Sequence, residues 1–384
     1  MRVALNLEQC FQRPPGGIGR YASELARVLP GAGAPGEVVV VPFVARHAPA
    51  TVRSVLAAAG VTAEAVALGL PRPVLYEAWN RWGRADPLRG HGSLALRDVD
   101  VVHAPSVAVP PRRFAPLVVT VHDAAPLRFP DTYPRRGRRF HELGFAAAAA
   151  RADAVVAPSV AAADEVAEFT AIERSRIHPI HHGVDHTAAS ADDVARVRVA
   201  LGLDPDEPYV AWVGTLEPRK DVATLVEAFA RAVVARGLPH RLVLVGPPGW
   251  LAGADAAARA AAPLGDRVTF TGPVPADHLR AVHAGADVFA LPSRHEGFGM
   301  PVLEAMAQGT AVVASDLAVL REVGGDTVRY APVGDPGAWA EVLAALLDDA
   351  PTRTALGDAA RARAATFTWE RSAAEHLAVY RSVA

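Results

Sequence analysis

Two glycines and two carboxylates lie together in the stretch from Ser293 to Glu304, which reads Ser-Arg-His-Glu-Gly-Phe-Gly-Met-Pro-Val-Leu-Glu. It follows an apolar strand pattern and opens a helix at Pro301, because the fixed φ and missing N–H of proline suit the first helical position. A glycine loop before a helix lets backbone N–H groups approach an anion such as phosphate, which the positive end of the helix dipole also favours. Glu296 and Glu304 are too few to form a metal cage, so we expect them to accept hydrogen bonds from hydroxyl groups on either side of the phosphate. The stretch therefore predicts a site for a nucleotide sugar.

A second group of charged residues, Arg219 and Lys220, follows the predicted strand Tyr209 to Val213 and precedes a helix with one apolar face. A guanidinium grips phosphate oxygens in a fork and an ammonium supplies a compact charge, so this pair suits a departing diphosphate. The alternative is an ordinary surface salt bridge. Lys220 is the only lysine in the chain, which favours a position that arginine does not fill.

The N-terminal half contains two weaker candidates for a binding site. Gly16 and Gly17 stand between a strand at Arg2 to Leu7 and a helical pattern, which is compatible with a phosphate loop or with a plain turn. His122 follows the strand pattern Leu117 to Val121, at the carboxyl end where open α/β sheets place their ligands. The alternative for His122 is a histidine that caps a loop.

Two basic clusters receive other interpretations. The arginines between Arg135 and Arg139 precede a helix, and we interpret them as a solvated basic face, with contact to anionic lipid or a charged acceptor as the alternative. His178, His181 and His182 lack acidic or cysteine partners at ligand spacing, so we predict no metal site.

Composition narrows the class of protein. The 384 residues exceed one ordinary core, so we expect two domains. A formal net charge of −2 gives no general attraction to nucleic acid. Cys10 is the single cysteine, which excludes an internal disulfide and fits a reducing cytosol. The sequence shows no charged leader and no apolar run of about 18 residues, so we expect a cytoplasmic protein that is neither exported nor membrane-spanning.

Apolar runs alternate with helical stretches in both halves of the chain. This alternation predicts an α/β architecture in which parallel sheets are wrapped by helices. Between the halves, the sequence loses its periodicity among Ala, Ser, Asp and Pro residues, which predicts an interdomain linker. The predicted boundaries are 1–186 for the first domain, 187–207 for the linker, 208–366 for the second domain and 367–384 for a C-terminal helix that needs a surface to cover.

Taken together, the motifs resemble a known family. The Gly16-Gly17 pair, the block Gly214-Thr-Leu-Glu-Pro-Arg-Lys-Asp221 and above all the block from Glu296 to Glu304 look like the retaining glycosyltransferases of family 4, which have the GT-B fold. The resemblance covers nearly the whole chain, and its most specific motifs lie in the second half. It implies two Rossmann-like domains that face each other across a cleft. The C-terminal domain would hold the nucleotide sugar and the N-terminal domain the acceptor, with the last helix crossing back to the N-terminal domain.

The resemblance also implies roles for individual residues. Arg219 and Lys220 match the pair that binds the donor diphosphate, and Glu296 matches the residue that contacts the sugar hydroxyls. His122 matches the histidine that lies over the reacting sugar. These four are the predicted catalytic residues, and the predicted donor-binding residues are Gly16, Gly17, Gly214, Thr215, Val274, Phe298, Gly299, Met300, Leu303 and, as the ribose contact, Glu304.

The expected activity is a retaining hexosyl transfer that needs no metal or other cofactor. The donor would be GDP-mannose or a UDP-sugar, and the acceptor a sugar, a lipid-linked sugar or a small molecule. Both glutamates have hydroxyl-binding roles, so no carboxylate is left as a nucleophile, unlike in retaining glycosidases, and charge stabilisation of the diphosphate would dominate. A dinucleotide-dependent oxidoreductase is disfavoured because Arg13 to Gly19 does not fit Gly-x-Gly-x-x-Gly. A nucleotide-sugar epimerase and a non-catalytic sugar-nucleotide-binding protein of the same fold stay open.

Overall fold

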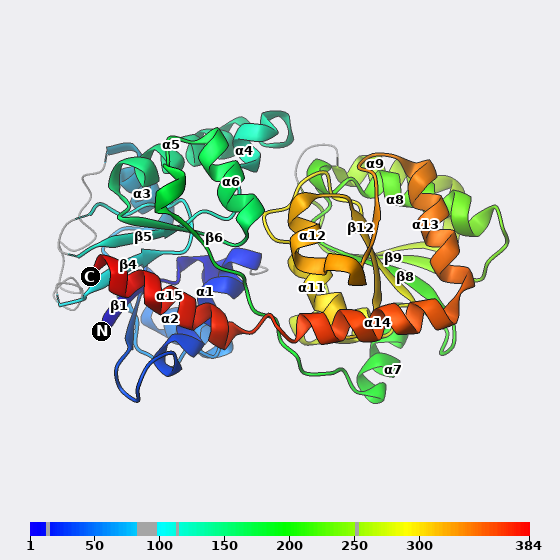
Figure 1. Ribbon diagram of the computed structural model, residues 1–384, viewed down its shortest axis with the longest axis horizontal. Coiled ribbons are helices and arrows are strands. Elements are labelled where there is room, and N and C mark those ends of the chain that lie inside the picture. The colour runs from blue at the N-terminus through cyan, green and yellow to red at the C-terminus, as the bar shows by residue number, and fades with distance from the viewer. Residues whose placement is uncertain (13–15, 83–97, 113–114, 250–252) are drawn as a thin grey trace. The chain divides into compact units, whose positions relative to one another are not determined.

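The computed structural model describes residues 1–12, 16–82, 98–112, 115–249 and 253–384. Residues 13–15, which belong to the predicted N-terminal glycine loop, lie outside the described residues. The chain divides into two compact units (Figure 1). The first unit comprises Met1–Pro130, Arg135–Gly183 and Thr368–Ala384, and the second comprises Asp131–Pro134 and Val184–Phe367.

The first unit is built on a parallel sheet of strand order β3-β2-β1-β4-β5-β6-β7. Its central strands are short runs of valine, alanine and leucine that are buried almost throughout, as expected for a parallel sheet with helices on both faces. The strands are β1 Arg2–Asn6, β2 Val39–Val44, β3 Val66–Ala67, β4 Val101–Ala104, β5 Leu117–Thr120, β6 Ala154–Ala157 and β7 Ile177–Pro179. The helices include α1 Gly17–Val28, α2 Pro49–Ala58, α3 Arg72–Glu77, α4 Ala125–Arg128, α5 Arg135–Arg151 and α6 Val160–Phe169.

The second unit repeats this architecture with a parallel sheet of strand order β10-β9-β8-β11-β12-β13. The strands are β8 Tyr209–Val213, β9 Arg241–Val245, β10 Val268–Gly272, β11 Val288–Leu291, β12 Ala311–Ser315 and β13 Arg329–Ala331. The helices include α7 Ala191–Ala200, α8 Val222–Phe229, α9 Gly253–Ala261, α10 Leu279–Ala284, α11 Met300–Ala307, α12 Ala318–Gly324, α13 Pro336–Asp348 and α14 Ala350–Ala364. The prediction of two Rossmann-like α/β units is therefore confirmed.

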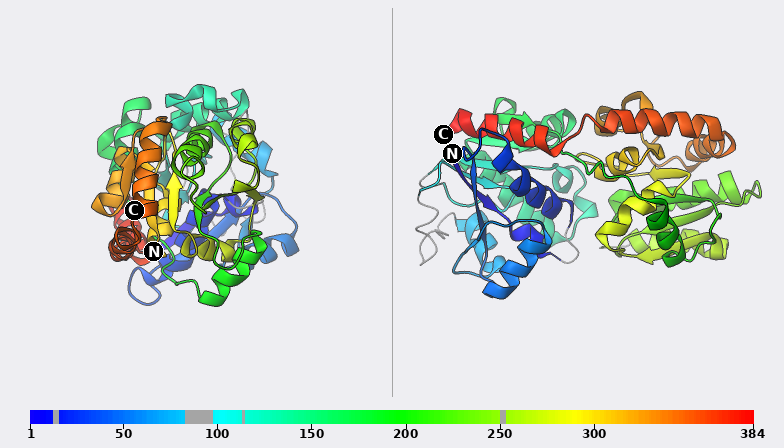
Figure 2. Two further views of the ribbon diagram at one scale, coloured as in Figure 1. Left: turned by 90° about the vertical axis from the view of Figure 1, so that its right-hand side faces the viewer. Right: turned by 90° about the horizontal axis from the view of Figure 1, so that it is seen from below.

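The last helix, α15 Trp369–Val383, belongs to the first unit although α14 belongs to the second. Figures 1 and 2 show α15 alongside α1. Trp369, Leu377 and Tyr380 of α15 share one hydrophobic core with Tyr21 and Leu25 of α1. An amphipathic helix must bury its apolar face against another element, and this core supplies the surface. The predicted return of the C-terminal helix to the N-terminal part of the fold is confirmed.

The segment that we predicted as an interdomain linker, 187–207, lies within the second unit. Its helix α7 begins with a capping box, in which Ser190 and Asp193 satisfy each other's backbone N–H groups. The backbone N–H of Ala189 donates to the side-chain oxygen of Gln308 at 3.0 Å. Most residues of α7 are exposed, which accounts for the polar composition of this part of the segment.

Candidate active site

The strand order of the second unit reverses at β8, which pairs with β9 on one side and with β11 on the other. Ligands of open α/β sheets bind at the carboxyl ends of the strands that flank such a switch point. The loop after β8 carries Arg219 and Lys220, and the loop after β11 carries Glu296. The backbone N–H of Arg294 donates to the carbonyl oxygen of Arg219 at 2.8 Å, so the two loops are joined.

Lys220 and Glu296, which are buried, and Arg219, which is partly buried, form one charged cluster. Lys220 Nζ donates to Glu296 Oε1 at 2.6 Å, and Ser293 Oγ donates to the same oxygen at 2.6 Å. The guanidinium of Arg219 lies 3.5 Å from Glu296 Oε2 and donates to the carbonyl oxygen of His295 at 2.7 Å. Lys220 and Glu296 are each 8% exposed, so the pair is not the surface salt bridge that we considered as the alternative.

The charges of the cluster fix the ionisation of Glu296. Burial is the largest single influence and by itself raises the pKa of this carboxyl, whereas the positive charges of Lys220 and Arg219 lower it. With hydrogen bonds from Lys220 and Ser293 added, the pKa of Glu296 falls to about 2. The carboxylate is therefore ionised at neutral pH, and removal of either partner would leave a buried charge uncompensated.

Glu217 is a member of this cluster that the sequence analysis did not assign to the site. Its Oε1 accepts from Arg219 Nη2 at 2.5 Å, and the residue is 4% exposed. With Glu217 included, two carboxylates face two cations, so the cluster is formally neutral. The signal was present in the sequence, because Glu217 stands two positions before Arg219 in the same loop.

The turn that presents Lys220 has an uncommon backbone conformation. Asp221 has a φ of 47°, and no other non-glycine residue among those that the structure describes has a positive φ. Aspartate tolerates this left-handed region better than most residues, because its short polar side chain bonds to nearby backbone. Asp221 ends the turn Pro218–Lys220 and precedes α8, so this turn sets the position of the lysine at the strand end.

Glycines bring the loops after β8, β9 and β10 into contact. Gly246 has a φ of 140°, and a Cβ there would lie 1.7 Å from the carbonyl oxygen of Gly214, so no side chain fits. The N–H of Gly246 donates to the carbonyl oxygen of Gly272 at 2.9 Å. These contacts place the predicted donor-binding residues Gly214, Thr215 and Val274 at the same edge of the sheet as the charged cluster.

Helix α11 begins where the sequence predicted a helix start. Its N-cap, Gly299, has a φ of 91°, and a Cβ there would lie 2.4 Å from Leu320 Cδ2. Met300 is partly exposed at the first helical position. Phe298 and Leu303 are buried, Leu303 completely, so the side chain of Leu303 packs in the core of the unit.

Glu304 lies on α11, one turn beyond Met300. Its Oε2 is 3.7 Å from Nε2 of the buried His283, and its side chain is 14% exposed. In chain order the two predicted hydroxyl-binding carboxylates, Glu296 and Glu304, thus bracket the start of the helix.

The remaining predicted residues, Gly16, Gly17 and His122, belong to the first unit. His122 follows β5 and its Nε2 donates to the carbonyl oxygen of Pro105 at 2.9 Å, so the loop-capping contact that we considered as the alternative is present. Burial lowers the pKa of His122, so the ring is neutral and its Nδ1 carries a lone pair. A Cβ at Gly16 or Gly17 would meet no atom within 4 Å, so packing within the unit does not require glycine at either position.

The described residues contain no group of three or more His, Cys, Asp or Glu side chains placed to hold a metal ion. His182, one of the clustered histidines, packs its ring instead at 4.7 Å from Tyr21 and 6.0 Å from Trp369, between centroids. Whether the reaction needs a metal is a separate question, and metal independence stays a prediction.

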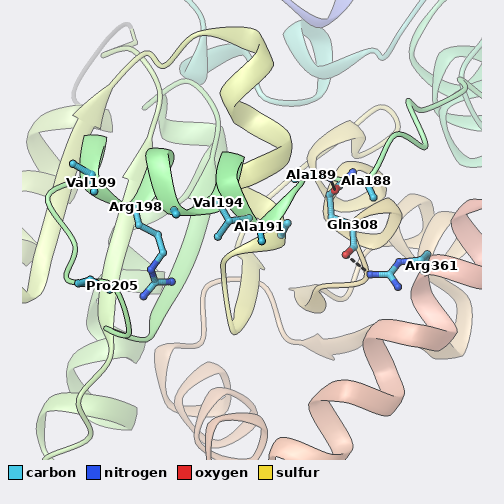
Figure 3. A pocket seen from close by; sticks show the side chains of 11 residues that line it. Ala188, Ala189, Ala191, Val194, Arg198, Val199, Pro205, Gln308 and Arg361 are labelled. Carbon is cyan, nitrogen blue, oxygen red and sulfur yellow. Dashed lines mark hydrogen bonds between the residues drawn. The ribbon is translucent and has the colours of Figure 1, made fainter.

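A pocket of about 500 Å³ lies along α7 in the second unit (Figure 3). None of the predicted site residues lines it. The two guanidinium groups that line it make structural hydrogen bonds to the backbone. Arg361 donates to the carbonyl oxygen of Gln308 at 2.7 Å, and Arg198 donates to that of Gly285 at 3.3 Å. This pocket is therefore not part of the candidate active site.

Both halves of the chain match family models. Residues 15–188 match the model described as Glycosyltransferase Family 4, and residues 193–363 match the model described as Glycosyl transferases group 1. The fold and the charged loop cluster agree with this class. The chain belongs to glycosyltransferase family 4.

Curated relatives of the chain include enzymes named D-inositol 3-phosphate glycosyltransferase. The one from Nocardia farcinica is 37% identical over 249 residues, which cover 62% of this chain and 54% of that protein. The one from Xylanimonas cellulosilytica is 34% identical over 283 residues, which cover 69% of this chain and 66% of that protein. The chain thus spans between about half and two thirds of the length of these relatives.

Solved structures share the fold. Anabaena HepE, crystallised in complex with UDP and glucose, is similar with a TM-score of 0.75 at 18% identity, over 100% of this chain and 99% of that one. Sucrose-phosphate synthase from Thermosynechococcus elongatus gives a TM-score of 0.76 at 24% identity, over 100% of this chain and 98% of that one. The predicted GT-B fold is confirmed.

Proposed function

We propose that the chain is a retaining, metal-independent glycosyltransferase that moves a hexose from a nucleoside-diphosphate sugar to a hydroxyl group of an acceptor. The observation that carries the proposal is the charged cluster of Arg219, Lys220 and Glu296 at the carboxyl ends of β8 and β11. Membership of family 4 and the names of the curated relatives support it.

Donor binding would rearrange the partners of the two cations. The cluster is formally neutral without a ligand, so diphosphate oxygens would take over from Glu296 and Glu217 as partners of Lys220 and Arg219. The N-terminus of α11 at Gly299 adds the positive end of a helix dipole, which favours the same anion. Glu296 would then accept hydrogen bonds from sugar hydroxyls.

The transfer step would rest on charge stabilisation. The bond between the anomeric carbon and a diphosphate oxygen breaks, and Arg219 and Lys220 stabilise the charge on the departing diphosphate. The acceptor hydroxyl forms the new bond on the same face, and its proton passes to a diphosphate oxygen. Because Glu296 and Glu304 bind hydroxyl groups, no carboxylate acts as a nucleophile. A β-linked product from an α-linked donor, identified by NMR, would contradict retention.

The candidate donors are UDP-sugars and GDP-mannose, so mannosyl transfer is one form of the proposed reaction. The complex of HepE with UDP and glucose supports a uridine nucleotide. The relatives named for D-inositol 3-phosphate support a polyol or sugar acceptor, and a lipid-linked sugar or another small molecule stays a candidate.

We also propose a cytoplasmic location. Among the described helices, none is both long and apolar enough to cross a membrane. Arg135, Arg136 and Arg139 are exposed at the start of α5. Peripheral contact of this basic stretch with anionic lipid at the inner membrane face is a secondary proposal, beside the solvated face that we prefer.

A panel of nucleotide sugars tests the proposed function. A ligand present at 100 times its Kd stabilises the folded protein by about 2.7 kcal/mol, which is a clear thermal shift. We expect one nucleotide sugar to shift the melting temperature, and the same compound to release its nucleoside diphosphate when a sugar or polyol acceptor is added. Failure of every nucleotide sugar to stabilise the protein would overturn the proposal.

Transfer is expected to continue at an unchanged rate in excess EDTA. Metal-dependent transferases neutralise the diphosphate with a cation held by carboxylates, whereas here Arg219 and Lys220 supply that charge. Nucleoside diphosphate release with and without chelator measures the effect. A loss of activity in EDTA that magnesium or manganese restores would contradict metal independence.

Gly17→Ala is expected to leave the first unit as stable as the native one or more so, but to reduce transfer about tenfold, equal to about 1.4 kcal/mol. Gly17 is the first residue of α1 and a Cβ there meets nothing within 4 Å, so alanine gains about 0.5 to 1 kcal/mol in the helix. Lost turnover in a stable protein would indicate that the backbone at Gly17 approaches the donor. Gly31→Ala, where a Cβ also meets nothing within 4 Å, is the matched control. Equal turnover in both variants would remove Gly17 from the site.

A further inference from the structure

A chain of hydrogen bonds runs through the interior of the first unit, and both of its ends lie on α15. The hydroxyl of Tyr380 is 2.7 Å from His103 Nδ1, and His103 Nε2 is 2.8 Å from Thr120 Oγ1. Thr120 Oγ1 is 2.9 Å from the hydroxyl of Tyr21, which is 2.7 Å from His376 Nε2. Each of the five side chains is at most 1% exposed. This hydrogen-bond chain therefore joins α15, β4, β5 and α1, and its side chains are closed off from water.

One backbone carbonyl fixes the positions of the protons at the His376 end of this hydrogen-bond chain. His376 Nδ1 lies 2.7 Å from the carbonyl oxygen of Ser372, which can only accept, so Nδ1 carries a proton. Burial lowers the pKa of His376 to about 4, so the ring is neutral at pH 7 and its Nε2 is an acceptor. The hydroxyl of Tyr21 must then donate to His376, and the oxygen of Tyr21 must accept from Thr120.

The same reasoning gives the direction of each hydrogen bond between Thr120 and Tyr380. The single hydroxyl proton of Thr120 is directed at Tyr21, so His103 Nε2 must donate to Thr120. Burial holds the pKa of His103 well below its ordinary value, so this ring is also neutral and its Nδ1 accepts from Tyr380. Every hydrogen bond thus has one direction, and each histidine has one tautomer. Bonds ordered in this way reinforce one another in a low-dielectric interior.

The ring of Tyr21 is in contact with the proposed catalytic histidine. Its centroid lies 5.2 Å from that of His122 at an interplanar angle of 86°, and 4.7 Å from that of His182. The rings of His122 and His182 are 5.6 Å apart. His122 is therefore held by the Pro105 carbonyl at its Nε2, and its ring packs against the rings of Tyr21 and His182.

We propose that Tyr21 and His376 are positioning residues for His122: the C-terminal helix holds Tyr21 by its hydroxyl, and Tyr21 fixes the plane of the His122 imidazole. The effect on activity rests on the proposed glycosyl transfer, whereas the proton arrangement does not. Both side chains are buried away from any bound donor, so we expect their loss to lower turnover and to leave donor affinity unchanged.

Tyr21→Phe tests the proposal, because it removes the hydroxyl and keeps the ring. We expect kcat to fall about tenfold with the donor KM within about twofold of native, and Thr120→Val to give the same split. Thr120→Ser, which keeps the hydroxyl, should retain native values. Val379→Ala is the matched control, because it removes buried packing from α15 but none of the hydrogen bonds that connect Tyr380 to His376. We expect it to lower stability without changing kcat.

Histidine ¹⁵N NMR without substrate provides the second readout. The native protein should show the proton of His376 on Nδ1 and those of His103 and His122 on Nε2, and Tyr21→Phe should shift the resonances of both His376 and His122. A native His376 protonated on Nε2 would overturn the proton arrangement. Folded Tyr21→Phe with native kcat and native His122 resonances would overturn the positioning role. Should the native protein transfer no sugar at all, the proposed function fails, while the NMR result still decides the arrangement of the chain.

Discussion

Lys220→Met is expected to destabilise the second unit by about 3 kcal/mol and to reduce transfer by roughly a hundredfold or more. The ammonium group is 2.6 Å from Glu296 Oε1, and both residues are buried. Without it, an ionised carboxylate stays in a low-dielectric site with only Arg219 and Ser293 to compensate it. The departing diphosphate also loses one of its two proposed cations. Urea unfolding measures the first effect, and nucleoside diphosphate release at saturating donor measures the second.

Partner variants separate the two effects. Adding Glu296→Gln to Lys220→Met should restore most of the stability, because neither buried charge remains, but should not restore transfer. Lys220→Arg keeps the ion pair and should stay within about 1 kcal/mol of native stability. We expect it to lower turnover about tenfold, because the planar guanidinium is wider than an ammonium. Native turnover in Lys220→Arg would show that only the charge at this position matters.

The architecture could be predicted from the sequence because its signals are local. Central strands such as β8 and β12 are continuous apolar runs, and each is followed by a loop and a helical pattern. The segment at 187–207, which we predicted as a linker, falls within the second compact unit and contains α7, most of whose residues are exposed. The contact that fastens this segment, from Ala189 to Gln308, joins residues 119 positions apart. No local pattern reports such a contact.

For the candidate site, the sequence indicated individual residues but not the contacts between them. Arg219, Lys220 and Glu296 were each singled out, but the ion pair between Lys220 and Glu296 was not predicted. These two residues are 76 positions apart, and only the adjacency of β8 and β11 brings them together. The contact between Tyr21 and His376 spans 355 positions, and neither residue stands in a motif. Long-range pairing of this kind depends on the packed sheet and helices.

The first unit is expected to lose stability as the pH falls from about 6.5 to about 4. The pKa of His376 is about 4 in the folded protein, because the residue is buried, and about 6.5 in the unfolded chain. Between these values the unfolded chain binds a proton that the folded protein does not, so acid favours unfolding. The contribution is fully present above pH 6.5 and is lost by about pH 4, and for His376 alone it amounts to roughly 3 kcal/mol. Burial also lowers the pKa values of His103, His122 and His182, which act in the same direction.

The pH range of this loss, from about 6.5 to about 4, distinguishes it from acid denaturation caused by the protonation of carboxylates. Glu296 has a pKa lowered from about 4.5 to about 2, so its contribution is complete above pH 4.5 and falls only below that. Urea unfolding between pH 7 and pH 4.5, together with hydrogen exchange of α15 amides, therefore reports mainly on the buried histidines.

His376→Gln removes one titrating group and should give a lower stability at pH 7 but a shallower dependence of stability on pH. Protonation of His376 Nε2 would place a donor against the hydroxyl proton of Tyr21, so α15 amides should lose protection first. A stability that stays constant from pH 7 to pH 4.5 would mean that these rings take up protons in the folded protein at the same pH as in the unfolded chain. That result would contradict burial as a cause that keeps the rings neutral.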